Sequence, residues 1–379
     1  MRFLHLADLH IGKALHKQNL LEDQRYILQQ ILEIARTHQI DAVLIAGDVY
    51  QRNAPSADAM TLFSGFLSAV AEMHLPCYII SGNHDSAERV AYLSEIAARS
   101  GIRIAGAGTP GVCSFETEDA YGKLTVHLMP FTAPLPVRQL YSEEAEQIRS
   151  YDDAIRVLLS HHPLPEDGGR HIMVAHQYLT GGAVCDSEEL AIGGLDNISA
   201  DLFDGYDYVA LGHLHGPQQV SRPTVRYAGS PLKYSFSEVH QHKSVTIADV
   251  REKGNVVIET VPLVPLHEMQ ELTGSLDTLM QHELTEDYIH VILTDCNPPS
   301  DAVRMLRTVF PNLLQMTVQN TRISTYETPG EQTLPQQTDF AAMLSDFYAA
   351  QNQGAAPTER QMEIVRELLE KLDREAGAL

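Results

Sequence analysis

The chain has 379 residues, 44% of them hydrophobic and 20% charged, which is an ordinary composition for a soluble globular protein of one or two domains. A net charge of −23 excludes a protein that binds nucleic acid mainly through a diffuse basic face. Four scattered cysteines argue against a disulfide framework, and apolar stretches too short for a bilayer, with no secretory signal, predict a cytoplasmic protein without a membrane span.

The first hundred residues alternate between predicted strands and predicted helices. Short apolar runs, each followed by polar residues, predict strands at Arg2–Ala7, Ala42–Ala46 and Cys77–Ile80. Helical spacing of apolar residues predicts helices at Glu22–Thr37, Ser56–Met73 and Ala87–Arg99, and Ser56 is the predicted N-cap of the second. Such alternation is typical of an α/β domain with a largely parallel sheet.

Further strands follow in the middle of the chain. They are expected at Leu124–Leu128, Ile172–Ala175, Tyr208–Leu211, Thr224–Ala228, Ser244–Asp249 and Val256–Val261. One acidic helix is expected at Glu143–Leu159. The pattern therefore continues as α/β to about residue 261.

The composition changes after residue 261. A strand, a helix and a strand are predicted at Asp287–Leu293, Asp301–Val309 and Leu314–Gln319, which form a small α/β unit over 262–325. Residues 326–337 read as a linker. The remaining residues, 338–379, predict two amphipathic helices, the second of which opens with the capping box Thr358-x-x-Gln361. The second presents an apolar stripe of Val365, Leu368, Leu369 and Leu372. The apolar stripes of the two helices either pack on this protein or dock onto a partner helix.

Five predicted strands end in residue types that bind metals. These endings contribute Asp8 with His10, Asp48, Asn83 with His84 and Asp85, His176, and His213 with His215. Each ending has a simpler interpretation as a turn or a buried histidine. All five together indicate a common site, because ligands gather at the carboxyl ends of strands in α/β sheets.

The ligand types favour two ions of a borderline or hard transition metal. A mixed set of aspartate, asparagine and histidine suits manganese, iron or zinc better than calcium or a thiolate-bound metal. The seven residues Asp8, His10, Asp48, Asn83, His176, His213 and His215 are too many for one ion. Asp48 stands alone in the middle of this series, which is where a shared, bridging carboxylate is expected.

In this order the motifs resemble those of the calcineurin-like metallophosphoesterase family, with every ligand position filled. More narrowly, the chain is similar to the bacterial SbcD nuclease subunits through motifs outside the ligands. These are Leu21–Gln24 with Tyr26–Leu28, Gly181-Gly182 followed by Ser187-Glu188, and Ala228–Pro231 with Tyr234–Glu238. The resemblance covers residues 1–260, and the later segments match the family's cap domain and ATPase-binding segment in layout.

The resemblance implies a four-layer sandwich of two β-sheets flanked by helices, with two divalent ions, usually manganese. One ion takes Asp8, His10, Asp48 and His215; the other takes Asp48, Asn83, His176 and His213. His84 is the expected general acid, and Asp85 is a candidate to orient it. One departure concerns Gln51, which stands where archaeal and eukaryotic relatives carry a histidine, and it bears on the rate or polarity of exonuclease action.

The implied function is that of a DNA nuclease subunit of an SbcCD-type complex. It combines double-strand exonuclease and single-strand endonuclease activity in DNA end processing, repair and recombination. Residues 1–261 are the expected nuclease domain and 262–325 the cap domain. After the linker, 338–379 would bind an SbcC-type coiled-coil ATPase, and a homodimer is implied.

Two other functions compete with this one. A phosphoesterase for a small molecule or nucleotide would use the same metal site, and a metal-dependent scaffold would use it without catalysis. Lys13, Lys17, Arg52 and Arg89 are the local cations available to attract phosphate, although each also reads as solvated surface. Weak DNA affinity is therefore expected for the chain without a partner.

Overall fold

The computed structural model describes residues 1–106, 111–188, 196–295 and 297–319, together with 345, 347–349, 355–365 and 368. The chain forms two compact units, Met1–Glu271 with Glu286–Ile289, and Leu272–Thr285 with His290–Leu379. The expected domain boundaries at residues 261 and 325 stay predictions. Among the described residues, no helix is both long and apolar enough to cross a membrane.

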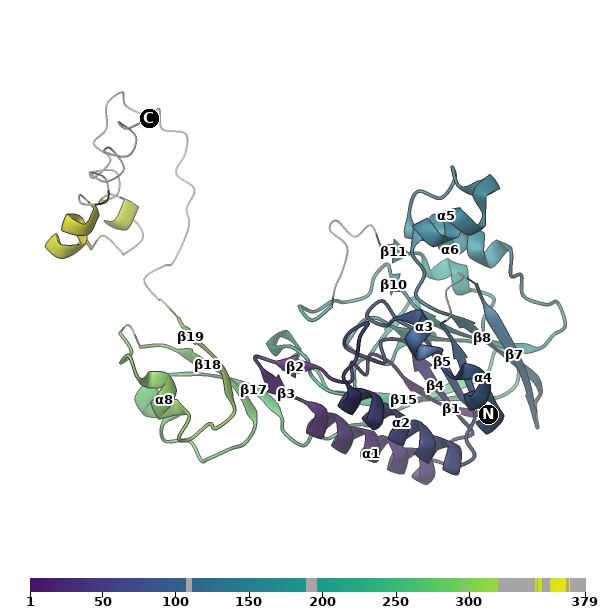
Figure 1. Ribbon diagram of the computed structural model, residues 1–379, viewed down its shortest axis with the longest axis horizontal. Coiled ribbons are helices and arrows are strands. Elements are labelled where there is room, and N and C mark those ends of the chain that lie inside the picture. Colours follow the sequence, from purple (N-terminus) through teal and green to yellow (C-terminus); the bar gives the residue numbers. More distant parts are fainter. Residues whose placement is uncertain are drawn as a thin grey trace. The chain divides into compact units, whose positions relative to one another are not determined.

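The first unit is built on two sheets. The first sheet has the order β16-β15-β1-β4-β5-β6, formed by Val256–Pro262, Ser244–Val250, Arg2–Leu6, Ala42–Ala46, Cys77–Ile80 and Ile102–Ala105. The four strands from β1 to β6 are parallel, whereas β15 and β16 are antiparallel to their neighbours. The parallel strands therefore bring their carboxyl ends to one edge (Figure 1).

The second sheet has the order β13-β14-β12-β9-β8-β7. Its strands are Gln218–Val220, Arg222–Tyr227, Tyr208–Gly212, Arg170–His176, Gly122–Met129 and Cys113–Asp119. The four central strands are parallel, and β7 and β13 are antiparallel edge strands. Here too, neighbouring strands end side by side.

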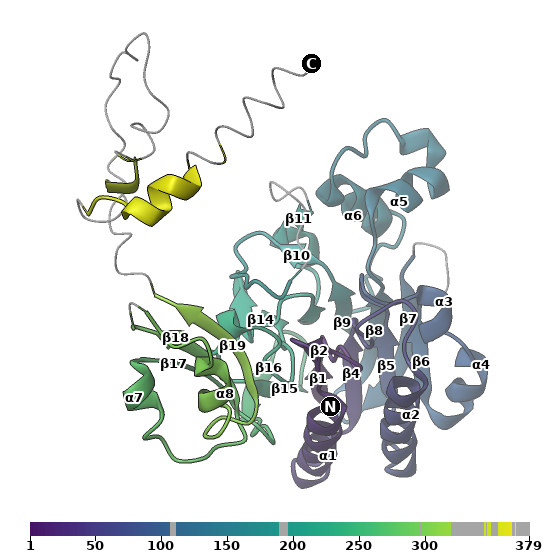
Figure 2. The same cartoon turned by 60° about the vertical axis from the view of Figure 1, so that its left-hand side comes forward.

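The two sheets pack face to face. In β4, Ala42, Leu44 and Ala46 join a core shared with Val126 and Val174 of the second sheet, so the alternate residues of β4 face outward. Helices α1 (Leu21–Thr37) and α2 (Ala57–Glu72) cover that outer side, as Figure 2 shows.

Helix α6 (Tyr151–Ser160) covers the outer face of the second sheet. Its Ile155 and Leu158 pack into a separate core with Met173 and Val209. Helix α5 (Pro134–Leu140) lies beside it. This order of helix, sheet, sheet and helix confirms the four-layer α/β sandwich.

Two predicted helices differ from the structure. The helix expected over 87–99 is broken into α3 (Ala87–Val90), α4 (Ser94–Ala97) and the 3-10 turn Ala98–Ser100, because Leu93 takes a left-handed backbone with φ of 63°. The helix expected over 143–159 begins only at Tyr151, where Ser150 and Asp153 form a capping box. A 3-10 turn at Ser142–Glu144 precedes it.

Short elements connect these layers. They are the strands β2 (Ala14–Leu15), β3 (Gln18–Asn19), β10 (Tyr178–Leu179) and β11 (Asn197–Ile198), with 3-10 turns at Ala200–Phe203 and Phe236–Glu238. Hairpin β2-β3 comes after Asp8 and His10, which follow strand β1.

The C-terminal part contains a three-stranded sheet of order β17-β18-β19, with strands Met269–Gly274, Tyr288–Leu293 and Leu313–Val318. Helices α7 (Leu276–Leu279) and α8 (Ala302–Leu306) accompany it. The predicted linker lies outside the described residues, as does most of the predicted helix pair. Within it, residues 359–365 are helical, and the N–H groups of Thr358 and Gln361 donate to each other's side-chain oxygens, at 2.8 and 3.3 Å.

Candidate metal centre

The structure brings together all seven predicted ligands and His84. Asp8, His10, Asp48 and Asn83 follow β1, β4 and β5 of the first sheet, and His176, His213 and His215 lie at the ends of β9 and β12 of the second. The carboxyl ends of the parallel strands meet here. Residues more than 200 positions apart thus share one site because the two sheets pack face to face.

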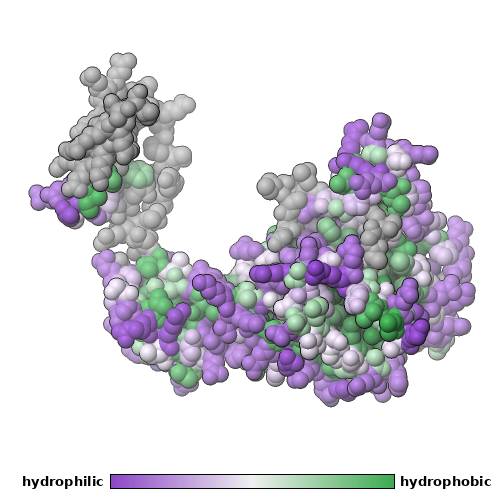
Figure 3. All heavy atoms as spheres, in the orientation of Figure 1, coloured by the Kyte–Doolittle hydropathy of each residue, from purple (hydrophilic) through white to green (hydrophobic). Residues whose placement is uncertain are grey.

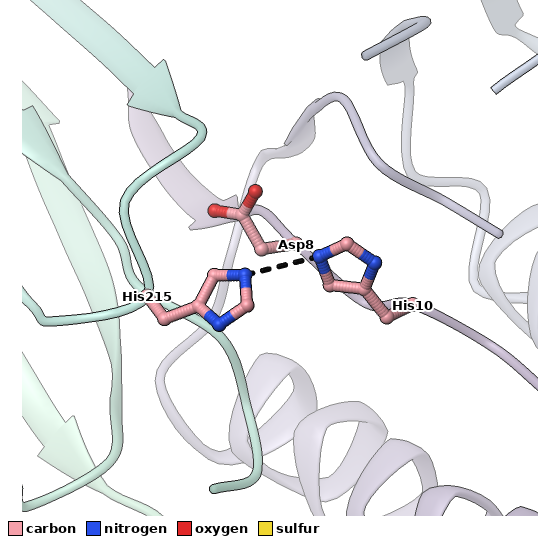
Figure 4. Close-up of side chains that lie close together, drawn as sticks. All are labelled: Asp8, His10 and His215. Atoms are coloured by element: carbon pink, nitrogen blue, oxygen red, sulfur yellow. Dashed lines mark hydrogen bonds between the residues drawn. The ribbon is translucent and has the colours of Figure 1, made fainter. Parts of the chain in front are cut away.

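One group of ligand atoms comes from Asp8, His10 and His215 (Figure 4). The Nε2 atoms of His10 and His215 lie 3.1 Å apart. Their side chains are at most 2% exposed, and Asp8 is fully buried. Two imidazole nitrogens and a carboxylate without access to bulk water form a donor set that suits a transition-metal ion.

The second group surrounds Asn83. Its Oδ1 lies 3.0 Å from His176 Nε2 and 3.1 Å from His213 Nδ1. Between the two groups stands Asp48, whose Oδ2 is 3.6 Å from His10 Nε2 and 3.5 Å from His176 Nε2. Because this one oxygen faces histidines of both groups, Asp48 has the geometry of a shared ligand.

These donor atoms are suited to divalent metal ions. Asp8, Asp48 and His176 also place ligand atoms within 4.8 Å of one another, as do His10, Asp48 and His84. The site is buried, so the two carboxylates are costly there without cations. The residues present therefore fit a centre that holds divalent ions.

The electrostatics of the site reflect this burial. Burial raises the pKa of Asp8 well above its usual value and lowers that of His213 to about 3. Burial opposes the charged form of His176 as well, but the Asp48 carboxylate beside it raises the pKa of His176 to about 9.

The backbone at the ligands is strained. Asp8, His10, Asp48 and His213 have φ values of 51°, 43°, 49° and 107°. Side chains other than glycine rarely adopt this left-handed region, and such strain concentrates at functional sites. All four are proposed ligands, so the strained backbone coincides with the candidate site.

Two glycines allow the loops to approach each other. A Cβ atom on Gly82 would collide with the carboxylate and backbone nitrogen of Asp48. A Cβ atom on Gly212 would collide with the carbonyl oxygen of Ala46 and lie 2.8 Å from Nδ1 of His176. Glycine is therefore required where the strand ends converge.

Asp85 differs from the role expected for it. Its carboxylate accepts hydrogen bonds from the backbone N–H groups of Val49, Tyr50 and Gly82, at 2.9 to 3.0 Å. Both oxygens are used in this way, so Asp85 ties the loop after β4 to the loop after β5 instead of orienting the His84 ring. His84 remains 11% exposed at the mouth of the site.

Supporting residues around His10 and His215 carry no role in the sequence analysis. Gln24 Nε2 donates to the carbonyl of His10 at 2.8 Å, and Tyr234 Oη donates to the carbonyl of Leu9 at 2.6 Å. Glu238 lies beside His215, and Lys243 contacts both. The family motifs contain Gln24, Tyr234 and Glu238, but only the fold shows what they contact.

The other candidates are not part of the ligand cluster. Lys13 lies 5.6 Å from the centre of the Tyr234 ring, while Lys17, Arg52 and Arg89 are exposed. The Gln51 side-chain oxygen is buried and has no hydrogen-bond partner among the described residues. His5 lies within hydrogen-bond distance of Tyr208 Oη and the Leu211 carbonyl and thereby links the two sheets.

Comparisons with known proteins identify the family to which the chain belongs. Residues 1–217 match the family model of calcineurin-like phosphoesterases, and residues 265–352 match the type 5 capsule protein repressor C-terminal domain. Among solved structures, a dimetal phosphatase from Danio rerio aligns with a TM-score of 0.42 at 10% identity, over 70% of this chain and 98% of that one. By its match to the family model, the chain belongs to the calcineurin-like phosphoesterases.

Two relatives of higher sequence identity show to which branch of this family the chain belongs. The SbcD component of the SbcCD nuclease from Staphylococcus saprophyticus is 31% identical over 355 residues, which cover 92% of each chain. That of Staphylococcus epidermidis is 32% identical over 324 residues, covering 83% of this chain and 85% of the relative. Within the phosphoesterases, the chain is thus a member of the SbcD family of nuclease subunits.

Proposed function

We propose that the chain hydrolyses DNA phosphodiesters with two divalent ions, as the nuclease subunit of an SbcCD-type complex in DNA end processing, repair and recombination. The observation that carries this proposal is the position of Asp48 Oδ2 between two groups of buried ligand atoms. The first ion takes Asp8, His10, Asp48 and His215, and the second takes Asp48, Asn83, His176 and His213. Double-strand exonuclease and single-strand endonuclease activities are both expected.

The ligand side chains hold the ions, and the ions supply Lewis-acid activation of a water and of the phosphate. The chain itself must still provide a proton for the leaving sugar oxygen. His84 fits this role because it is partly exposed and its Nε2 lies 3.9 Å from Asp48 Oδ2, at the edge of the ligand cluster. General acid catalysis of this kind contributes about 10²–10⁴-fold to the rate.

Manganese is the proposed metal, with iron and zinc as the alternatives. The support is chemical: imidazole nitrogens are combined with carboxylate and amide oxygens, and none of the seven proposed ligands is a cysteine. Metal analysis of protein purified without added ions distinguishes the three.

The proposed partners are DNA, an SbcC-type coiled-coil ATPase and a second copy of the chain. The ATPase would bind residues 338–379, joined by the linker 326–337 to a cap domain at 262–325. For the homodimer, the large exposed side chains Tyr92, Leu93 and Ile96 offer a surface. Figure 3 shows apolar atoms gathered over α4, which contains Ile96. A cytoplasmic location stays a prediction.

The decisive assay compares DNA with small phosphoesters. The purified chain, loaded with Mn²⁺, is incubated with linear duplexes that have free or blocked ends, with single-stranded DNA and with a nitrophenyl phosphodiester. Cleavage of DNA at a higher kcat/KM than the small ester supports the nuclease. Turnover of the small ester alone would favour the small-molecule phosphoesterase, and no turnover of any substrate by the ion-loaded protein would favour a scaffold.

A further inference from the structure

A buried ion pair lies directly behind the metal centre. Glu238 is fully buried and Lys243 is 6% exposed, and Glu238 Oε2 lies 2.5 Å from Lys243 Nζ. Three further acceptors lie 2.8 to 2.9 Å from the Lys243 ammonium, namely the carbonyl of His215, the Ser230 hydroxyl and the Gln241 side-chain oxygen, so its three protons are shared among four acceptors. Burying two charges rarely adds net stability, so the pair calls for a functional reason.

The second oxygen of Glu238 determines the direction of a hydrogen-bond chain. The Ser187 hydroxyl donates to Glu238 Oε1 at 2.5 Å, and Ser187 Oγ lies 2.8 Å from His215 Nδ1. An ionised carboxylate only accepts, and a serine hydroxyl has one proton. Ser187 therefore gives its proton to Glu238 and accepts one from His215 Nδ1–H.

This chain of hydrogen bonds fixes the tautomer of His215. With the proton on Nδ1, the lone pair is on Nε2, which is the atom that faces His10. The backbone of His215 is held as well, since its N–H donates to Glu188 Oε1 at 2.6 Å and its carbonyl accepts from Lys243. Hydrogen bonds to Ser187, Glu188 and Lys243 thus fix both the ring and the main chain of His215.

The other half of the centre uses a different device. His176 Nδ1 lies 2.8 Å from the backbone carbonyl of Ala46, which accepts its proton. The Ala46 carbonyl thus fixes the tautomer of His176, as Ser187 and Glu238 fix that of His215. Changing Glu238 should consequently affect only the half of the site that contains His215.

We infer that Glu238, Lys243 and Ser187 are positioning residues that hold His215 as the Nδ1–H tautomer and so prepare its Nε2 to bind one ion of the pair. This rests on the proposed two-metal function. The ion shared by Asp8, His10 and His215 depends on these hydrogen bonds, and the ion at Asn83, His176 and His213 does not. Partners of this kind typically contribute about 10–100-fold in metal affinity.

The first test needs no metal. In full-length, metal-free protein with ¹⁵N-labelled histidine, wild-type His215 should show a protonated Nδ1 and an unprotonated Nε2. In Glu238→Gln the amide can donate to Ser187, which then donates to Nδ1, so the proton should move to Nε2. An unchanged His215 tautomer in a folded Glu238→Gln protein would overturn the inference.

The second test measures ion binding by calorimetry with Mn²⁺. Wild type should bind two ions, whereas Glu238→Gln should bind one with unchanged affinity and the other about 10–100-fold more weakly. The matched control is Asp119→Asn, which weakens the ion pair with the buried Arg170, at the opposite end of β9 from His176. It should bind both ions like wild type.

Three results separate the possible failures. A wild-type protein that does not bind two metal ions contradicts the proposed function. The tautomer measurement then still decides the inference. A wild type that binds two ions, beside a Glu238→Gln protein that binds both equally well, contradicts only the inference. If the single variant does not fold, the doubly neutral Glu238→Gln, Lys243→Met variant is used with the same two measurements, and wild-type behaviour there also overturns it.

Discussion

The two oxygens of Asp48 face different partners, and one partner is the backbone of His84. Asp48 Oδ1 accepts a hydrogen bond from the His84 N–H at 2.9 Å, while Oδ2 lies among the imidazoles of His10, His84 and His176. The proposed bridging ligand therefore also fixes the main chain of the proposed acid. Losing Asp48 and losing the His84 ring should have separable consequences.

Replacing Asp48 by alanine should remove the ions. The side chain is buried and its Oδ2 faces both ligand groups, so both ions lose a shared anionic ligand. We expect elemental analysis to fall from about two metal ions per chain to fewer than one. Asp58→Ala, at an exposed position of α2, is the matched control and should keep both. An unchanged metal content in Asp48→Ala contradicts the bridging role.

Replacing His84 by alanine should have the opposite profile. Metal content should stay at the wild-type value, while kcat for DNA cleavage should fall about 10²–10⁴-fold because proton donation to the leaving oxygen is lost. The exposed His240 provides the control, since His240→Ala should retain normal kcat. Full activity in metal-loaded His84→Ala protein would rule out the general-acid role.

Two glycine-to-alanine changes should act in opposite directions. In Gly82→Ala the new methyl group meets the Asp48 carboxylate, so we expect a loss of about 1–3 kcal/mol in the free energy of unfolding and weaker ion binding. In Gly65→Ala, inside α2, nothing lies within 4 Å of the added Cβ. That change should stabilise the helix by about 0.5–1 kcal/mol. Thermal and chemical unfolding of the metal-free proteins measures both, and a Gly82→Ala protein as stable as wild type speaks against the close approach.

Removing residues 338–379 should separate partner binding from chemistry. The truncated chain should no longer co-purify with the SbcC-type ATPase but should still cleave simple DNA substrates. A finer variant is Leu368→Asp, because Leu368 belongs to the predicted apolar stripe and is 55% exposed. The control is Glu359→Ala on the same predicted helix. Co-purification of the truncated chain at the wild-type level would place the ATPase contact elsewhere.

Charging the surface over α4 should disrupt the proposed homodimer. Ile96 is 60% exposed, and Ile96→Glu puts a charge where a second copy would bury an apolar side chain. Sedimentation should show a shift from dimer to monomer. Leu135→Glu on α5, where Leu135 is 62% exposed, controls for the added charge and should leave the dimer intact. A dimeric Ile96→Glu protein rejects this surface.

The secondary structure and the ligand positions were predicted most accurately where one physical requirement dominates. A strand buried on both faces must be a continuous apolar run, and β4 and β5 have the predicted bounds for that reason. Apolar runs of this kind reveal where strands end. The predicted ligands follow those strand ends, and the structure places them in one cluster. Helix α2 likewise begins after Ser56, the predicted N-cap.

Helix bounds and side-chain partners were predicted less accurately where tertiary contacts determine them. Periodicity over 87–99 favours a helix, yet Leu93 is left-handed and interrupts it. Asp85 reads as a partner for the adjacent His84, but its acceptors are used by backbone N–H groups of two loops. Glu238 and Lys243 sit more than 20 residues from His215, and no local pattern shows that they contact it.

The arrangement of strands has a consequence for how the protein matures. Strands β1 and β4 can pair once the first 46 residues have left the ribosome, but β1 also pairs with β15, whose Asp249 lies opposite Arg2. The proposed ligands His213 and His215 come only after most of the second sheet has been made. Contacts between such distant segments form slowly because long loops must close first. Metal loading should therefore be a post-translational event, and the bound ions should mark chains whose first unit has finished folding.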